Sequence, residues 1–293
     1  MIRTNSAATR SVAVPALFVL LWSTGFIGAK LGLPYAEPLS FLLLRFVCVL
    51  ILLTALALGL RRTWPRQPVQ YWHLAVAGAL IHGGYLSGVF AAIHQGMSAG
   101  VVALIVGVQP LLTAMLSEAM VGEKVTPRQW LGFALGFGGV VLVVWNKLGL
   151  GGIDTAGLML AAMALLSITF GTLYQKRFCT EMDLWSGSVV QFVAAALVLL
   201  PFALAFEQME IRWTGQFLFA LGWLILVLSL GAISLLHLLI KHGAATRVSA
   251  LFYLTPPTTA LLAYLIFDER LAPLALAGMA LSAFGVWLAV SRR

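Results

Sequence analysis

Ten long runs of apolar residues fill most of this chain, and they restrict it to folds that cross a membrane. Each run is close to the length of about 20 residues that an α-helix needs to span the hydrocarbon core of a bilayer. No alternating strand pattern competes with them, which argues against a membrane barrel. The runs are Val12–Leu33, Leu39–Leu60, Trp72–Ile93, Ala99–Val121, Pro127–Trp145, Ala156–Tyr174, Leu184–Phe206, Trp213–Leu239, Ala244–Phe267 and Leu271–Val290. We therefore predict an all-α membrane protein with ten transmembrane helices.

Composition supports this prediction and narrows the functional class. Hydrophobic residues make up 61% and charged residues 10% of the 293 residues, whereas soluble domains average about 45–50% apolar and about 25% charged residues. The sequence contains no G-x-x-x-x-G-K-[ST] loop for nucleotide hydrolysis and no H-E-x-x-H metal motif. We expect a protein that is not an enzyme, holds no metal or cofactor, and works in the lipid bilayer on a small-molecule substrate.

The second half of the chain repeats the first. Eight of twenty positions are identical, without a gap, between Glu123–Leu142 and Glu269–Leu288. The matched residues keep an offset of 146: Pro110, Glu123, Pro127, Gly132 and Gly139 with Pro256, Glu269, Pro273, Gly278 and Gly285. Five runs fall in each half, and an odd number makes the second half enter the membrane from the opposite side. We predict two inverted five-helix repeats, residues 1–148 and 149–293.

The distribution of positive charges predicts the orientation. With the N-terminus in the cytoplasm, thirteen Lys and Arg residues fall on the cytoplasmic side and four, Lys30, Lys147, Arg212 and Arg270, on the other. This is the expected cytoplasmic excess, so both termini are predicted to be cytoplasmic, in a bacterial inner membrane. The net charge of +8 follows from this topology, and we expect no nucleic-acid partner.

Polar and aromatic residues inside the runs are the candidate substrate-binding residues, because a polar group surrounded by lipid needs a partner. They are Trp22, Ser23, Thr24, His82, Tyr85, Gln109, Ser167, Thr169, Tyr174, Ser229, Tyr253 and Thr255. Small polar residues also join helices to one another through hydrogen bonds. Packing is therefore the alternative role for them.

Two ionisable residues need an explanation of their own. Arg45 is a charge inside an apolar run, where it costs about 2.5–3.5 kcal/mol on insertion scales. Arg45 has two alternative roles. It either anchors the helix or pairs with a group inside the protein, or it contacts an anionic group of the substrate. His82 lies one helical turn from Tyr85; it could relay protons or be a structural, hydrogen-bonded residue.

Prolines and glycines mark candidate hinges. Pro110, and Pro256 with Pro257, remove backbone hydrogen bonds at matched places in the two halves, and freed carbonyls need a new partner. Gly83 and Gly84 allow close approach or movement of helices. The small-residue patches Gly132-x-x-x-Gly136 and Gly278-x-x-x-Ser282 suit helix packing or contact between two copies, so a monomer or a homodimer is expected.

These motifs resemble the ten-helix EamA branch of the drug/metabolite transporter superfamily. The resemblance lies in the doubled pattern P-x12-E-[KR]-x2-P-x4-G-x6-G, in L-L-W-S-T-G-F at Leu20–Phe26, and in L-L-R-F at Leu43–Phe46. It implies an exporter with a central cavity that opens alternately to each side. The branch includes bacterial exporters of amino acids, aromatic ones among them. Gln109 stands where many relatives have an acidic residue before the proline.

We therefore expect a secondary transporter that exports amino acids, aromatic or large and apolar, and related small metabolites. Trp22, His82, Tyr85, Tyr174 and Tyr253 would line its cavity with aromatic rings that suit such side chains. The alternative is a multidrug or quaternary-cation exporter of the same superfamily. That function requires an intramembrane carboxylate, for which Glu118 is the candidate.

Overall fold

The fold is almost entirely helical. The computed structural model describes residues 5–97, 99–145, 155–267 and 273–291, and among these no strand forms beyond one isolated bridge between Ala36 and Ile211. The helices of the first half are α1 (Asn5–Gly32), α2 (Pro38–Gly59), α3 (Pro68–Gly78), η1 (Ala79–Gly84), α4 (Tyr85–His94), α5 (Ala99–Val106), α6 (Gln109–Val121) and α7 (Pro127–Val144). Those that follow are α8 (Thr155–Phe178), α9 (Leu184–Phe206), α10 (Gly215–Trp223), η3 (Leu224–Ala232), α11 (Ile233–His242), α12 (Ala245–Ala250), η4 (Leu251–Leu254), α13 (Thr255–Phe267) and α14 (Pro273–Val290).

Eight helical stretches within the described residues are long and apolar enough to cross a membrane. They coincide with eight of the ten predicted runs. The other two runs are also helical, one as α7 and the other as α12, η4 and α13. The charged pair Glu269 and Arg270, predicted to match Glu123 and Lys124, lies outside the described residues. The multi-pass helical prediction is confirmed at this level.

Two of the long helices contain a π-helical segment near the middle. η1 joins α3 to α4 without interruption, and η3 joins α10 to α11. Inside η3, the Ser229 hydroxyl donates to the carbonyl of Leu224, five residues earlier, over 3.1 Å. π-segments widen the helix locally and are frequent at functional sites. They place His82 and Ser229 at irregular points of otherwise continuous helices.

The prolines predicted as hinges begin new helical segments rather than kinking continuous ones. Pro110 is the second residue of α6, after a turn at residues 107–108 that separates α5 from α6. Pro256 and Pro257 follow Thr255 at the start of α13, directly after the 3₁₀ segment η4. Proline is well accommodated in a first helical turn, where its missing N–H would have no partner.

Helices α7 and α14 pack against each other in antiparallel directions through matched glycines. A Cβ on Gly139 would lie 2.6 Å from the carbonyl oxygen of Gly278, and one on Gly132 would lie 2.6 Å from that of Gly285. Ser282 adds a hydrogen bond to the carbonyl of Gly136 at 3.2 Å. Only glycine permits backbones this close.

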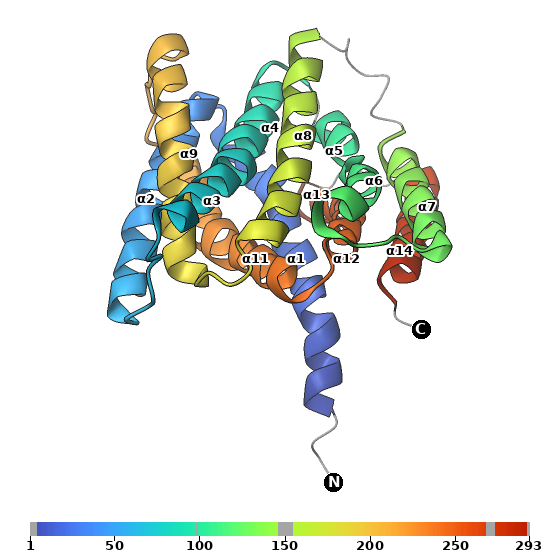
Figure 1. The fold of residues 1–293 in the computed structure, drawn as a ribbon. Coiled ribbons are helices and arrows are strands. Elements are labelled where there is room, and N and C mark those ends of the chain that lie inside the picture. The colour runs from blue at the N-terminus through green and yellow to red at the C-terminus, as the bar shows by residue number, and fades with distance from the viewer. Residues whose placement is uncertain (1–4, 98, 146–154, 268–272, 292–293) are drawn as a thin grey trace.

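Helices α2 and α9 also lie side by side and antiparallel (Figure 1). At one end the Glu207 carboxylate accepts hydrogen bonds from the backbone N–H groups of Leu39 and Ser40, both at 2.7 Å. At the other end Ser186 donates to the carbonyl of Thr63 at 2.6 Å. Anions favour helix N-termini, so Glu207 fixes the start of α2 against the end of α9.

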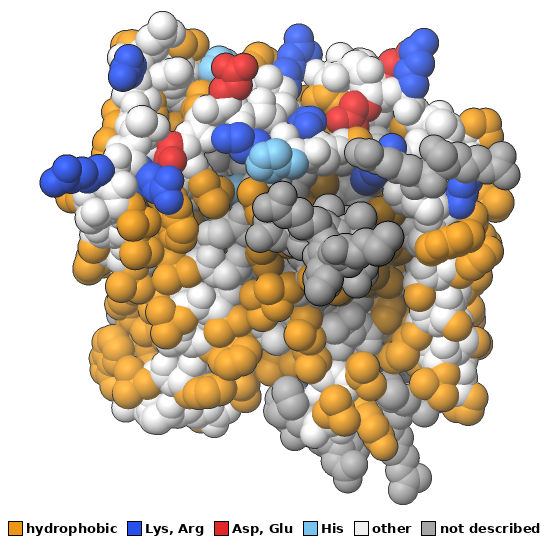
Figure 2. All heavy atoms as spheres, turned by 90° about the horizontal axis from the view of Figure 1, so that it is seen from below, with side chains coloured by type: hydrophobic (Ala, Val, Ile, Leu, Met, Phe, Trp, Pro, Cys, Tyr) orange, Lys and Arg blue, Asp and Glu red, His pale blue; other side chains and the backbone are white. Residues whose placement is uncertain are grey.

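The outer surface is largely apolar. Figure 2 shows charged side chains gathered in a band along one edge of the face seen, while hydrophobic side chains cover much of the remainder. Large side chains such as Ile51, Leu197 and Phe206 are exposed by 65%, 65% and 78%. Surfaces of this kind suit lipid rather than water.

Candidate functional site

An aromatic cluster forms where α1 meets α4 and η4. Trp22 stacks on Tyr85 with ring centroids 6.1 Å apart and an angle of 14° between the planes. Phe252 meets Trp22 edge-on at 5.2 Å, and Phe18 joins both. A void of about 30 Å³ lies beside Trp22 and Tyr85. The rings of the cluster pack against one another.

Arg45 lies next to this cluster, in the buried interior of the molecule. Its side chain is completely buried. The Nε and Nη2 groups both donate to the Ser229 hydroxyl oxygen, at 3.0 and 2.9 Å, while Nη1 has no hydrogen-bond acceptor. Among the described residues no carboxylate is within ion-pair distance of the guanidinium. A buried cation without an anion is costly, which makes Arg45 a candidate ligand-binding group.

His82 extends the polar centre toward α9 and α11. Its ring stacks on Phe192, with centroids 4.2 Å apart and planes 8° from parallel, and lies 6.1 Å from the ring of His237. The Gln191 amide and the Arg45 guanidinium are its other polar neighbours. Neither ring nitrogen of His82 makes a hydrogen bond of normal geometry.

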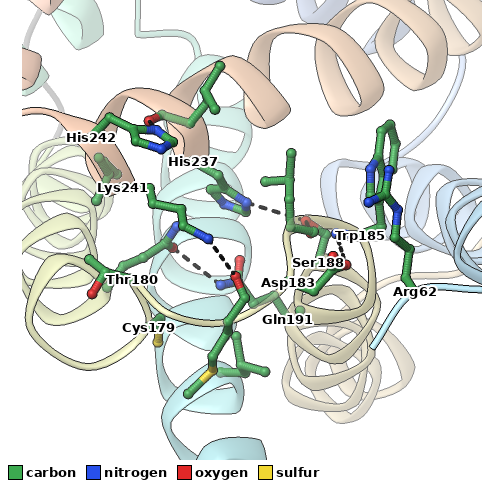
Figure 3. A pocket seen from close by; sticks show the side chains of 17 residues that line it. Arg62, Cys179, Thr180, Asp183, Trp185, Ser188, Gln191, His237, Lys241 and His242 are labelled. Atoms are coloured by element: carbon green, nitrogen blue, oxygen red, sulfur yellow. Dashed lines mark hydrogen bonds between the residues drawn. The ribbon is translucent and has the colours of Figure 1, made fainter. Parts of the chain in front are cut away.

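A pocket of about 310 Å³ leads to this centre from the surface. It lies between the end of α8, the start of α9 and the end of α11 (Figure 3). Arg62, Asp183, Lys241 and His242 line it together with the buried Gln175, Ser188, Gln191 and His237. Burial raises the pKa of the Cys179 thiol, which also lines the pocket, to about 12, so this thiol is neutral at physiological pH.

Several predicted residues serve as contacts within or between helices. Ser23 and Thr169 donate to carbonyls four residues earlier, Val19 and Leu165, both at 2.7 Å. Thr24 accepts a hydrogen bond from the Trp223 indole at 2.9 Å. These bonds match the packing role of small polar residues.

Other predicted residues contact neither Arg45 nor the aromatic cluster in the hydrogen bonds and packing contacts that they make. The Tyr174 hydroxyl is 2.7 Å from His73 Nδ1, on the side where α3 meets α8. Ser167 packs against Gly84, whose added Cβ would lie 2.4 Å from the Ser167 hydroxyl, whereas Gly83 has room around it.

Three of the predicted residues near the interrupted helices are buried and have polar atoms without partners. They are Gln109, with both amide atoms unpaired, Tyr253 and Thr255. Tyr253 packs its ring against Gly136 of α7. These three side chains are polar but uncharged, so they add hydrogen-bonding groups to the interior without adding a charge.

The structure also reveals Gln191 and His237, which were not among the predicted site residues. The repeat could have indicated Gln191, because the offset of 146 carries Arg45 onto it. Likewise an offset of 147, which relates Ile93 to Ile240, carries His82 onto Ser229. Arg45 thus corresponds to Gln191, and its partner Ser229 corresponds to His82. The pair Arg45 and Ser229 is matched by the neighbouring pair Gln191 and His82.

A multi-pass helical bundle whose buried polar centre is reached through a pocket has the construction of a membrane transport protein. Comparison with known proteins identifies the family: the model of the EamA-like transporter family matches residues 11–145 and again residues 155–291. The chain belongs to this family.

Relatives and a solved structure agree with this assignment. The chain is 26% identical to the uncharacterized transporter YvbV of Bacillus subtilis, over 93% of this chain and 89% of YvbV. It is 25% identical to the uncharacterized inner membrane transporter YedA of Escherichia coli, with the same coverage. It is 26% identical to a probable amino-acid metabolite efflux pump of Escherichia coli, over 94% and 92% of the chains. A solved crystal structure with 21% identity superposes with a TM-score of 0.79 over 98% of both chains, which shows the same fold.

Proposed function

We propose that this protein is a secondary transporter that exports amino acids, aromatic or large and apolar, and related small metabolites by alternating access. The carrying observation is Arg45, a completely buried guanidinium with a free Nη1 and no carboxylate partner among the described residues. An α-carboxylate satisfies both the charge and the unpaired donor, because charge-assisted hydrogen bonds to carboxylates are the strongest that Arg makes.

Two inverted five-helix repeats, residues 1–148 and 149–293, are the proposed architecture for this transport. Support comes from helices at matched positions that pack in antiparallel directions, α2 with α9 and α7 with α14. Further support is that Gly25 packs on Leu228 while its repeat counterpart Gly171 packs on Ile81. A pseudo-two-fold axis between inverted halves is the usual basis of alternating access.

The preference for large apolar side chains is drawn from the aromatic cluster of Trp22, Tyr85 and Phe252. The void beside it holds about 30 Å³, too little for a ring, so a substrate ring would enter as the helices separate. Stacked and edge-on ring contacts contribute about 0.5–1.5 kcal/mol each beyond burial. The pocket of Figure 3 is the proposed route from the cytoplasm.

The family and its relatives support the setting. The relative named a probable amino-acid metabolite efflux pump and the one named an inner membrane transporter motivate export of amino acids from a bacterial inner membrane. The excess of Lys and Arg in the loops on one side supports a cytoplasmic location for both termini. A monomer or a homodimer would carry out this function, and no enzymatic activity is proposed.

A cation exporter is less well supported by the described residues. Glu118, the candidate carboxylate, is exposed and lies 3.7 Å from Lys124, with 67% of its side chain accessible. A carboxylate at the surface is solvated by water, so its attraction for a quaternary cation is weak and would not offset the cost of moving that cation into the membrane.

The test compares substrate analogues in proteoliposomes that contain the purified protein. Radiolabelled phenylalanine uptake by counterflow is measured with unlabelled phenylalanine or phenethylamine, which lacks the carboxylate, as competitor. We expect phenethylamine to compete at least about 10-fold more weakly, since a hydrogen bond to a charged group contributes about 1.5–3 kcal/mol. Arg45→Gln should reduce this discrimination, and Arg66→Gln, at an exposed position, should not.

Equal competition by the two compounds in the wild-type protein would contradict the role of Arg45. This comparison needs no variant, so it stands even if Arg45→Gln does not fold.

A further inference from the structure

An open groove lies where the start of α7, the end of α14 and α12 meet. It has a volume of about 1030 Å³ and shares no lining residue with the pocket of Figure 3. α7 and α14 form the edge of the bundle opposite α2 and α9 (Figure 1), so the groove lies where lipid surrounds the bundle. Its lining residues are Thr126, Arg128, Gln129, Arg247, Trp287, Leu288, Ala289 and Ser291.

Two arginines give the groove a positive charge. Arg128 and Arg247 are both half-buried, and no carboxylate is among the described residues that line the groove. Glu123, on the loop before α7, accepts hydrogen bonds from the backbone N–H groups of Ala245 and Thr246 instead. The C-terminus of α14 adds only a partial negative charge, about half of an elementary charge. Two like charges at one groove repel each other, so the groove favours an anion.

The Arg128 side chain is held in a fixed position. Its Nη2 group donates to the Ser291 hydroxyl at 2.7 Å, and its guanidinium carbon lies 5.3 Å from the centre of the Trp287 ring. These contacts join the start of α7 to the end of α14. The Nε and Nη1 groups of Arg128 make no hydrogen bond with the described residues, so donors remain for a ligand.

Arg247 has no partner of its own. Its side chain makes no hydrogen bond, ion pair or ring contact with any described residue, although it is half-buried. A guanidinium that is partly withdrawn from water loses hydration, and an anion compensates for this loss. Its planar set of N–H donors matches two phosphate oxygens at once. Phosphate is therefore the anion that suits this groove.

Exposed aromatic side chains continue from the arginines along the outer surface of α7 and α14. Trp287 is 57% exposed and stacks on Phe284, which is 51% exposed, with ring centroids 5.7 Å apart. Trp130 on α7 is 39% exposed. Tryptophan is enriched at the level of the lipid headgroups. A ligand on the arginines thus has apolar surface beside it, which an acyl chain covers and a free phosphate ion does not.

We infer that this groove binds an anionic phospholipid, with its phosphate on Arg128 and Arg247 and an acyl chain along Trp287 and Phe284. The distribution of Lys and Arg predicts that this end of the bundle is cytoplasmic, and anionic lipids of the cytoplasmic leaflet attract basic side chains. A bound phosphate joins α12 to the pair of α7 and α14. The inference does not depend on the substrate proposed above, because the groove lies apart from the Arg45 centre.

The test measures thermal unfolding of the purified full-length protein in detergent with one additive at a time. The additives are phosphatidylglycerol, phosphatidylcholine with the same acyl chains, and inorganic phosphate. We expect phosphatidylglycerol to raise the unfolding midpoint by several degrees, because a ligand that binds only the folded state stabilises it. Phosphatidylcholine and inorganic phosphate at the same concentration should leave the midpoint within about one degree of its value without additive.

Arg247→Gln removes one positive charge and no contact among the described residues. Without lipid, this variant should therefore unfold at the wild-type temperature. The phosphatidylglycerol concentration for half of the stabilisation should rise about 5-fold, since one basic residue near an anionic lipid contributes about 1 kcal/mol and about 1.4 kcal/mol is a factor of ten. Arg66→Gln removes the same charge at an exposed position and should respond to the lipid like the wild-type protein.

Four results would overturn the inference. Phosphatidylglycerol without effect, or equal stabilisation by the two lipids, would show that the anionic headgroup is not recognised. An effect of inorganic phosphate equal to that of phosphatidylglycerol would show an anion site that needs no lipid. An equal lipid response of Arg247→Gln and Arg66→Gln would mean that the lipid binds elsewhere. The comparison of additives uses the wild-type protein, so it stands whether or not Arg247→Gln folds.

Discussion

Ser229 holds the Arg45 guanidinium in place, and this pair sets the polar chemistry at the centre of the bundle. Two of the three nitrogens of Arg45 donate to one hydroxyl. That hydroxyl donates a hydrogen bond to the carbonyl of Leu224 inside the π-segment η3. The remaining nitrogen is the one left for a substrate. The orientation of the charge therefore depends on a serine 184 residues away in the chain.

Ser229→Ala should test this dependence. It removes the acceptor for two buried charged donors, which costs about 1–3 kcal/mol for an unsatisfied group. The midpoint of thermal unfolding in detergent should fall by several degrees, and half-maximal phenylalanine counterflow should require more substrate. Ser234→Ala, a half-buried serine on α11, is the matched control with a near-neutral effect. Equal stability and affinity in Ser229→Ala would show that Arg45 does not rely on Ser229.

At the scale of the elements, glycines decide how closely α7 and α14 pack. A Cβ on Gly139 would be 2.4 Å from the Ser282 hydroxyl and 2.6 Å from the carbonyl oxygen of Gly278. The neighbouring Gly138 has only a Leu281 methyl group within 4 Å, at 3.9 Å. The same substitution at adjacent positions therefore meets opposite environments.

Gly139→Ala should force the two helices apart, with an overpacking cost of about 1–3 kcal/mol. Gly138→Ala should be tolerated, and helix propensity even favours it slightly. Thermal unfolding of the two purified variants in the same detergent measures the difference. A midpoint for Gly139→Ala within one degree of the Gly138→Ala value would contradict the close approach seen here.

The sequence predicted the helices better than their interruptions. Apolar runs of bilayer length indicate spans because no other structure satisfies the backbone in lipid, and Pro110 and Pro256 indicated special points. The π-segments leave no comparable pattern, since η3 is as apolar as the helical segments on either side of it. The change of repeat offset from 146 at Phe192 to 147 at Ile240 was the one hint, and η3 is the longer of the two segments.

The candidate site was predictable in part. Arg45 stood out because it is a charge within an apolar run, and Trp22 and Tyr85 do stack on each other. Gln191 and His237 were missed because an amide and a second histidine near a helix end are common on protein surfaces. Their burial depends on how α8, α9 and α11 converge, which is a tertiary property that local pattern does not contain.

Across the whole molecule, the packing of the helices is similar in the two halves, whereas the buried polar groups differ. Helices at matched positions of the two halves pack antiparallel, yet the groups at the centre differ, with Arg45 and Ser229 on one side and Gln191 and His82 on the other. The proposed inverted framework with an asymmetric centre suits a transporter for an asymmetric substrate, whose carboxylate and ammonium ends need different partners.

Counterflow into proteoliposomes with phenylalanine, threonine and methyl viologen in parallel tests whether the protein is an amino-acid transporter. We expect saturable uptake of phenylalanine, weaker uptake of threonine because it lacks a ring for the aromatic cluster, and no uptake of methyl viologen, which has no carboxylate for Arg45. Uptake of methyl viologen without uptake of either amino acid would contradict this expectation.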